Sequence, residues 1–216
     1  MPTLEFHMNR IKSVFFIQIF VIYVRYLIGG AFVFASLIKI KGNRFTTFSH
    51  ENAPMGSTMH FFETLYQTGL YWQFIGWCQL LAGFLLMTQR FSKLGALVNF
   101  PILLNVFVIT ISMEFGFTYV ITGLMLLANL GLLVWHWEEL KSLVNLPSQA
   151  SQVLEERQKL WEFTGLVLFS FTAVYRFLHD FYNPFFWFGT CFLVGFVAFA
   201  IRLIQIKRGK SRHQLG

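Results

Sequence analysis

Hydrophobic positions fall into six long runs along the chain. These runs cover residues 14–40, 69–88, 94–113, 117–137, 160–178 and 185–206, with short polar segments between them. A helix needs about 20 apolar residues to cross about 30 Å of hydrocarbon. The pattern therefore predicts an all-α protein, a polytopic transmembrane helical bundle of about six spans.

The composition agrees with this prediction. Of the 216 residues, 56% are hydrophobic and 12% are charged, whereas soluble domains contain roughly 25% charged residues. So few charges exclude a water-soluble surface. The net charge of +7 does not indicate nucleic acid, because the basic residues lie between the apolar runs and in a short tail instead of on one amphipathic face. The lipid bilayer is the predicted surrounding.

The positions of the basic residues predict an orientation. Only Lys39, Lys41 and Arg44 fall on one side of the predicted spans, and two more lie within spans. The positive-inside rule makes the richer side the cytoplasm, so both termini are expected there, with the chain in the cytoplasmic (inner) membrane. The residues on the richer side are Arg10, Lys12, Arg90, Lys93, Lys141, Arg157, Lys159, Arg202, Lys207, Arg208, Lys210 and Arg212.

Two longer connections divide the chain. The second of them is polar, and it predicts a four-helix module at 1–144, a polar cytoplasmic linker at 145–159, and a transmembrane hairpin with a basic tail at 160–216. The first, residues 41–68, lies on the outer side. It ends in Phe61, Phe62, Leu65 and Tyr66 at helical spacing, which predicts an interfacial helix whose other face is polar.

The two charged residues of the first span lie on one face of the predicted helix, together with a serine, a glycine and a phenylalanine. The residues Arg25, Gly29, Phe32, Ser36 and Lys39 recur on one helical face. Because charges in lipid are costly, this face is expected to look into the bundle. One interpretation is that Arg25 and Lys39 only extend to opposite interfaces. The other is a site for an anion or a lipid headgroup.

Amide side chains supply further candidate contacts. Gln79 shares a face with Gly76 and Gly83, and Asn105 and Asn129 lie in the next two spans. Such amides either hydrogen bond between helices or hold the polar head of a lipophile such as a quinone. The candidate cofactor is quinone, and the candidate residues for binding it are Arg25, Lys39, Gln79, Asn105 and Asn129.

The outer side collects a second polar set. His60 and Glu63 are spaced so that both reach one ligand on a helix, and Arg176 and His179 lie at the third outer connection. They form either a polar site without metal or solvated loop residues. A metal site needs three or four convergent ligands, and none is predicted. Cys78 and Cys191 are expected to be free, and no residue is assigned as catalytic.

Short motifs in residues 22–142 resemble the DoxX-like family of four-helix membrane proteins. The resemblance rests on Arg25-Tyr-Leu-Ile-Gly-Gly-Ala-Phe followed by Ser36-Leu-Ile-Lys39, on Gly76 through Ala82-Gly83-Phe-Leu-Leu, and on Arg90-Phe-Ser-Lys-Leu-Gly95-Ala96. The hairpin from residue 160 departs from the four-helix pattern. Within these motifs, Arg25 and Lys39 match positions that the family pattern marks as polar and functional.

The resemblance implies three functions that stay open here. Some members are subunits of quinone-linked sulfur oxidation, including thiosulfate:quinone oxidoreductase, which implies a non-autonomous oxidoreductase subunit or accessory. Others act as assembly factors, which implies a membrane-protein partner or a homo-oligomer and no cofactor. A small-solute carrier is the third possibility, and the absence of a clear inverted repeat disfavours it.

Overall fold

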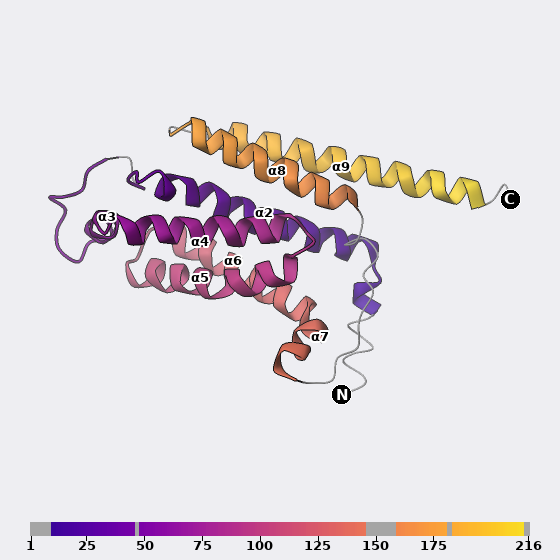
Figure 1. Ribbon diagram of the computed structural model, residues 1–216, viewed down its shortest axis with the longest axis horizontal. Helices are drawn as coiled ribbons and strands as arrows, with labels where there is room; N and C mark the ends of the chain where they lie inside the picture. The colour runs from indigo at the N-terminus through magenta and orange to yellow at the C-terminus, as the bar shows by residue number, and fades with distance from the viewer. Residues whose placement is uncertain (1–9, 46–47, 146–158, 181–182, 214–216) are drawn as a thin grey trace.

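The computed structural model describes residues 10–45, 48–145, 159–180 and 183–213, and within these ranges it contains helices and no strand (Figure 1). The all-α prediction is confirmed. The helices are α2 (Phe15–Ile40), α3 (Thr58–Gln67), α4 (Leu70–Met87), α5 (Ser92–Ser112), α6 (Thr118–Trp135), the short α7 (Trp137–Leu140), the 3-10 helix η1 (Lys141–Val144), α8 (Lys159–Leu178) and α9 (Pro184–His213).

Five of these helices are long and apolar enough to cross a membrane, namely α2, α4, α5, α6 and α9. They match five of the six predicted spans to within a few residues. The sixth segment, α8, is a helix of 20 residues, but Glu162 and Arg176 make it less apolar. A polytopic membrane bundle is confirmed, with five spans supported by length and composition, and a count of six remains a prediction.

The central helix of the bundle is α2. It packs most extensively on α4, and its other side contacts α8. Contact with α4 is close because glycines meet, and a Cβ atom on Gly83 would lie 2.7 Å from the Gly29 carbonyl oxygen. The predicted inward stripe of α2 is confirmed, since all five of its residues are buried: Arg25, Gly29, Phe32, Ser36 and Lys39.

The four-helix module has two different ends. We name the end formed by residues 41–69 and 113–117 the α3 end, and the end with the α4–α5 turn and α7 the α7 end. Lys41 and Arg44 lie at the α3 end, whereas Arg90 and Lys93 lie at the α7 end. The described basic residues are thus separated as predicted, while the cytoplasmic orientation itself stays a prediction. Most of the predicted linker, residues 146–158, lies outside the described residues.

Helices α8 and α9 form an antiparallel hairpin along the side of α2 that faces away from α5 (Figure 1). Close packing fixes α8, because a Cβ atom on Gly165 would lie 1.8 Å from the Met87 carbonyl oxygen. The Tyr26 hydroxyl also donates a hydrogen bond to the Trp161 carbonyl oxygen. By contrast, only 11% of the most apolar 18-residue segment of α9 is buried, so α9 presents most of its surface to lipid.

Candidate ligand cavity

A cavity of about 390 Å³ lies among the helices of the four-helix module, in the half nearest the α3 end. Helices α2, α4, α5 and α6 all contribute to its wall, which is mostly aliphatic and aromatic. A few polar groups converge on it, which is the usual composition of a small-molecule site. Its polar lining includes Lys39, Gln79, Asn105, Thr110, Thr118 and Thr122.

The structure brings together three of the five residues predicted to bind a cofactor, namely Lys39, Gln79 and Asn105. Lys39 reaches the cavity because the α2 stripe faces inward and because Gly76 lets α2 approach α4. A Cβ atom on Gly76 would lie 2.9 Å from the Ser36 carbonyl oxygen. The local sequence of α2 and α4 therefore places the ammonium group inside the bundle.

Lys39 is only 7% exposed. Its Nζ donates a hydrogen bond to the Ala35 carbonyl oxygen, 2.7 Å away in the same helix. The ammonium also lies 5.3 Å from the ring centroid of Phe45 and 5.2 Å from that of Trp72, within the range of cation–π attraction. Among the described residues no carboxylate pairs with it, so the cavity contains a buried basic group without a counter-ion.

The two amides lie at different depths from the surface of the bundle. Gln79 is 5% exposed, and its Oε1 has no hydrogen-bond partner within the described part of the chain. Asn105 is exposed on the lipid-facing side of α5, where hydrocarbon offers no hydrogen-bond partner and an unsatisfied amide is costly. Both amides therefore have capacity to bond to a ligand.

Two threonines are already satisfied. Thr110 of α5 and Thr122 of α6 share a hydrogen bond of 2.9 Å between their hydroxyl oxygens. Each hydroxyl also lies within hydrogen-bond distance of a carbonyl oxygen of its own helix, to which it donates: Phe107 for Thr110 and Thr118 for Thr122. These groups fix α5 against α6 beside the cavity and leave the recognition of a ligand to the lysine and the amides.

The cavity opens sideways, between α4 and α5. Tyr71 and Phe74 on this side are 54% and 58% exposed, and Asn105 lies opposite them on α5. This opening faces the region that hydrocarbon occupies around a membrane protein. A lipophilic molecule therefore has a route into the cavity from the bilayer without passing through water.

The outer loop covers the α3 end of the cavity. The Phe62 ring lies 5.8 Å from the Phe45 ring and 5.3 Å from the Phe115 ring, and all three line the cavity. The predicted helix in this loop is confirmed as α3. Its Ser57 cap accepts a hydrogen bond from the His60 backbone N–H, and Thr58 donates to the Met113 carbonyl oxygen at 2.7 Å.

Glu63, on the polar face of α3, is not a solvated loop residue, because it is only 4% exposed. Arg44 Nε donates to both Glu63 carboxylate oxygens, at 2.9 and 3.0 Å, and the His50 backbone N–H donates a third bond at 3.2 Å. A bidentate arginine holds a carboxylate in a fixed geometry. Arg44 and Glu63 thus fasten the loop over the cavity instead of forming a site with His60.

The rest of the predicted outer polar site lies elsewhere. Arg176 Nη1 donates to the carbonyl oxygens of His179 and Asp180, at 2.9 and 2.8 Å, and so caps the end of α8. The His179 ring stacks on the Tyr175 ring at 4.9 Å. The structure therefore does not gather His60, Glu63, Arg176 and His179 at one place. No group of three metal-ligating side chains occurs among the described residues.

Arg25 does not line the cavity but centres a hydrogen-bonded network near the α7 end. Its Nη1 donates to Gln89 Oε1 and its Nη2 to His136 Nε2, both at 2.9 Å. Arg25 is fully buried, so its guanidinium ends inside the bundle, and its depth in a membrane stays a prediction. Since a guanidinium only donates, His136 Nε2 accepts and its Nδ1 carries the hydrogen.

The network continues to the surface through Glu139. His136 Nδ1 lies 3.4 Å from Glu139 Oε2, and Lys93 forms an ion pair with the same oxygen. Burial alone would raise the pKa of Glu139, but the hydrogen bonds from His136 and Lys93 outweigh it and lower the pKa to about 2. Five polar side chains from four segments are joined in this way, and the result is a structural clamp.

Asn129, the remaining predicted residue, also has a structural role. The Asn99 amide donates to Asn129 Oδ1 at 3.0 Å, and Asn129 Nδ2 donates to the Ala96 carbonyl oxygen at 3.1 Å. Both asparagines are fully buried. They connect α5 to α6, which is the interhelical role that the sequence left open as an alternative to quinone binding.

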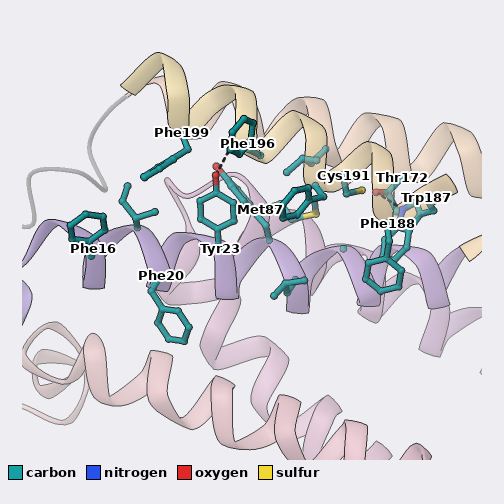
Figure 2. Close-up of a pocket in the computed structure, with 17 residues that line it drawn as sticks. Phe16, Phe20, Tyr23, Met87, Thr172, Trp187, Phe188, Cys191, Phe196 and Phe199 are labelled. Atoms are coloured by element: carbon teal, nitrogen blue, oxygen red, sulfur yellow. Dashed lines mark hydrogen bonds between the residues drawn. The ribbon is translucent and has the colours of Figure 1, made fainter. Parts of the chain in front are cut away.

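A second and larger cavity, of about 570 Å³, lies between α2 and the C-terminal hairpin (Figure 2). Figure 2 shows Tyr23 extending from α2 to α9, where its hydroxyl donates to the Gly195 carbonyl oxygen at 2.6 Å. Trp187 Nε1 donates to the Thr172 hydroxyl at 3.2 Å. Because these groups are paired within the protein, this cavity offers an apolar surface and little to recognise a headgroup.

Sequence reasoning missed the aromatic platform under Lys39 and the partners of Arg25. A tryptophan near the same depth as a buried lysine, as Trp72 is to Lys39, is a usable signal for the first of these. His136 carried a weaker signal, since it lies seven residues after Asn129 on the same face.

Comparisons of the chain with protein-family models, with curated proteins and with solved structures find no match.

Proposed function

We propose that this membrane protein binds a lipophilic molecule with a polar head, of the quinone class, in the cavity of its four-helix module. In this proposal it serves a quinone-linked redox system as a non-autonomous subunit or accessory. The observation that carries the proposal is the convergence of Lys39, Gln79 and Asn105 on one apolar cavity that opens toward lipid. The resemblance to DoxX-like proteins supports the same reading.

The three polar groups fit the two-ended chemistry of a quinone. Its carbonyl oxygens accept hydrogen bonds, which the lysine ammonium and the amide N–H groups donate. Its reduced form has hydroxyl groups that donate, and Gln79 Oε1 is an acceptor without a partner among the described residues. The aromatic side chains Phe45, Phe62 and Trp72 supply flat surfaces around the same space.

In this role the protein supplies position and electrostatics, while the bound carrier supplies the redox chemistry. Lys39 and the amides orient the head, and the apolar wall excludes water from it. The opening between Tyr71 and Asn105 allows exchange with the membrane pool. In this proposal the bound carrier exchanges electrons with a partner protein.

Native mass spectrometry of protein extracted in mild detergent tests the proposal. We expect the wild-type protein to retain quinone, and Asn105→Leu to lower the retained fraction by about three- to tenfold, since one hydrogen bond to the head is lost. The exposed position of Asn105 makes this replacement compatible with folding. Gln205→Leu is the matched control, because Gln205 is an exposed amide of α9 outside the cavity.

The proposal fails if the wild-type protein retains no quinone and if its removal leaves the quinone-dependent activity of the host membrane unchanged. Retention that is equal in wild-type protein and in Asn105→Leu would remove the cavity from the proposal. A membrane protein that co-purifies in place of quinone would favour the alternative function of an assembly factor or structural partner.

A further inference from the structure

We propose that the cavity selects an ionised headgroup and that Lys39 is its specificity-determining residue. The ligand class is then a lipophile with an anionic oxygen, such as a carboxylate or the ionised hydroxyl of a hydroxyquinone. This inference rests on the proposed function, because it concerns the same cavity, but it adds the charge of the ligand. The argument comes from the surroundings of one ammonium group.

Lys39 is a buried amine without a counter-ion in the described structure, and an anion that bonds to it would favour its charged form. Lys39 is 7% exposed, and a charge removed from water is costly unless it is paired and hydrogen bonded. An ammonium group has three N–H donors, and the structure accounts for one, in the bond to the Ala35 carbonyl oxygen. The rings of Phe45 and Trp72 attract the charge but do not neutralise it.

Nearby acidic groups are engaged elsewhere. Glu63 is held by Arg44, and Asp180 forms an ion pair with Lys41. The Arg176 guanidinium, which is also buried, acts on Lys39 as a second positive charge. No described carboxylate pairs with Lys39, so an anionic oxygen that enters the cavity there gains a charge-assisted hydrogen bond.

The position of Lys39 also sets the orientation of the ligand. It lies in the last turn of α2, beneath Phe45 of the covering loop, whereas Phe32 and Met125 line the cavity farther from the α3 end. An anionic head at Lys39 leaves the apolar wall for the tail. Gly76 of α4 packs against Lys39 of α2. Gln79 lies three residues after Gly76 in α4 and is then placed to bond to a second oxygen of the same head.

Two quinones with the same ring and alkyl tail but a different charge at neutral pH test this inference. One is a 2-hydroxy-3-alkyl-1,4-naphthoquinone, whose hydroxyl is ionised at neutral pH. The other is its 2-methoxy counterpart with the same alkyl tail, which is neutral. Quenching of tryptophan fluorescence reports binding, because Trp72 lines the cavity. We expect the ionised probe to bind the wild-type protein more tightly by about tenfold or more, since bonds to charged groups are the strong ones.

Substitutions identify the residue responsible. Lys39→Met removes the charge while keeping the length of the side chain, and we expect it to abolish the preference for the ionised probe. Lys39→Arg should keep the preference. Lys41→Met is the matched control. It also removes one lysine charge, but Lys41 lies two residues after Lys39 and forms an ion pair with Asp180 outside the cavity, so the preference should stay intact.

The possible failures are distinguishable. If the wild-type protein binds both probes with equal affinity, the charge selection is wrong while the quinone site stands. If neither probe binds, the proposed function itself fails. A preference that persists in Lys39→Met but disappears in Lys41→Met would overturn the assignment of Lys39.

Discussion

The four-helix module and the C-terminal hairpin bury different kinds of residue. In the most apolar 18-residue segment of α2, 67% is buried, against 11% in the corresponding segment of α9. The interior of the four-helix module contains polar side chains in hydrogen-bonded groups, such as Arg25 with His136 and Asn99 with Asn129. The hairpin contacts the rest through Gly165, through hydrogen bonds from the Tyr23 and Tyr26 hydroxyls and through a surface ion pair.

This difference shows how association works in lipid. Apolar side chains gain little by leaving hydrocarbon for another apolar surface, so helices are held by close packing and by hydrogen bonds. Directional polar contacts give the four-helix module one geometry and keep a polar cavity in a fixed shape. The hairpin has fewer such contacts, and we expect it to separate from α2 before the module itself unfolds.

Replacing Arg25 by leucine should produce the largest effect. It leaves Gln89 and His136 buried without their donor, and removing one partner of a buried charged network costs about 3–5 kcal/mol. Unfolding in detergent, followed by circular dichroism, measures the change. Arg90→Leu is the control, since Arg90 is exposed at the same end. Equal stability of the two variants would break the comparison, because the network would then contribute nothing.

Replacing Gly165 by valine should detach the hairpin selectively. A Cβ atom there meets the Met87 carbonyl oxygen, and such overpacking costs about 1–3 kcal/mol. Hydrogen exchange should increase in α8 and α9 and stay unchanged in α4, α5 and α6. Gly189→Val is the matched control, because nothing lies within 4 Å of a Cβ atom at Gly189. Faster exchange throughout the chain would show that the two regions are one unit.

Acid should weaken the network of the four-helix module. The pKa of Glu139 is lowered to about 2 in the folded protein, so its contribution is present above the unfolded pKa and is lost as the pH falls. We expect the free energy of unfolding to decrease by about 2 kcal/mol between about pH 5 and pH 2. Chemical denaturation at several pH values measures this. Glu139→Gln should remove that part of the pH dependence, whereas Glu138→Gln should retain it.

The smallest effect is expected at the surface contact of the hairpin. Lys41 holds Asp180, and this ammonium lowers the pKa of the Asp180 carboxyl, but the carboxylate side chain is 47% exposed. Exposed pairs contribute about 0.5 kcal/mol and are screened by salt. Asp180→Asn should therefore change the midpoint of unfolding only slightly, and less at high salt. A loss comparable to that in Gly165→Val would show that polar contacts also hold the hairpin.

The sequence by itself determined the membrane class, the helices and the inward face of α2. Apolar runs of about 20 residues have few alternatives to a helix in lipid. The stripe from Arg25 to Lys39 follows from the period of the helix alone, since residues at i, i+4 and i+7 share a face. The interfacial helix at residues 58–67 was likewise readable from spacing.

Only the tertiary structure decided which polar residues meet. Arg25 and His136 are 111 positions apart, and their contact depends on how α2 and α6 are rotated and at what depth each lies. The same rotation places Asn105 at the cavity and Asn129 against Asn99, although both are asparagines in neighbouring spans. Helical periodicity is a property of one helix, whereas the pairing of side chains between helices depends on their mutual packing, and a single sequence does not encode this packing in any local pattern.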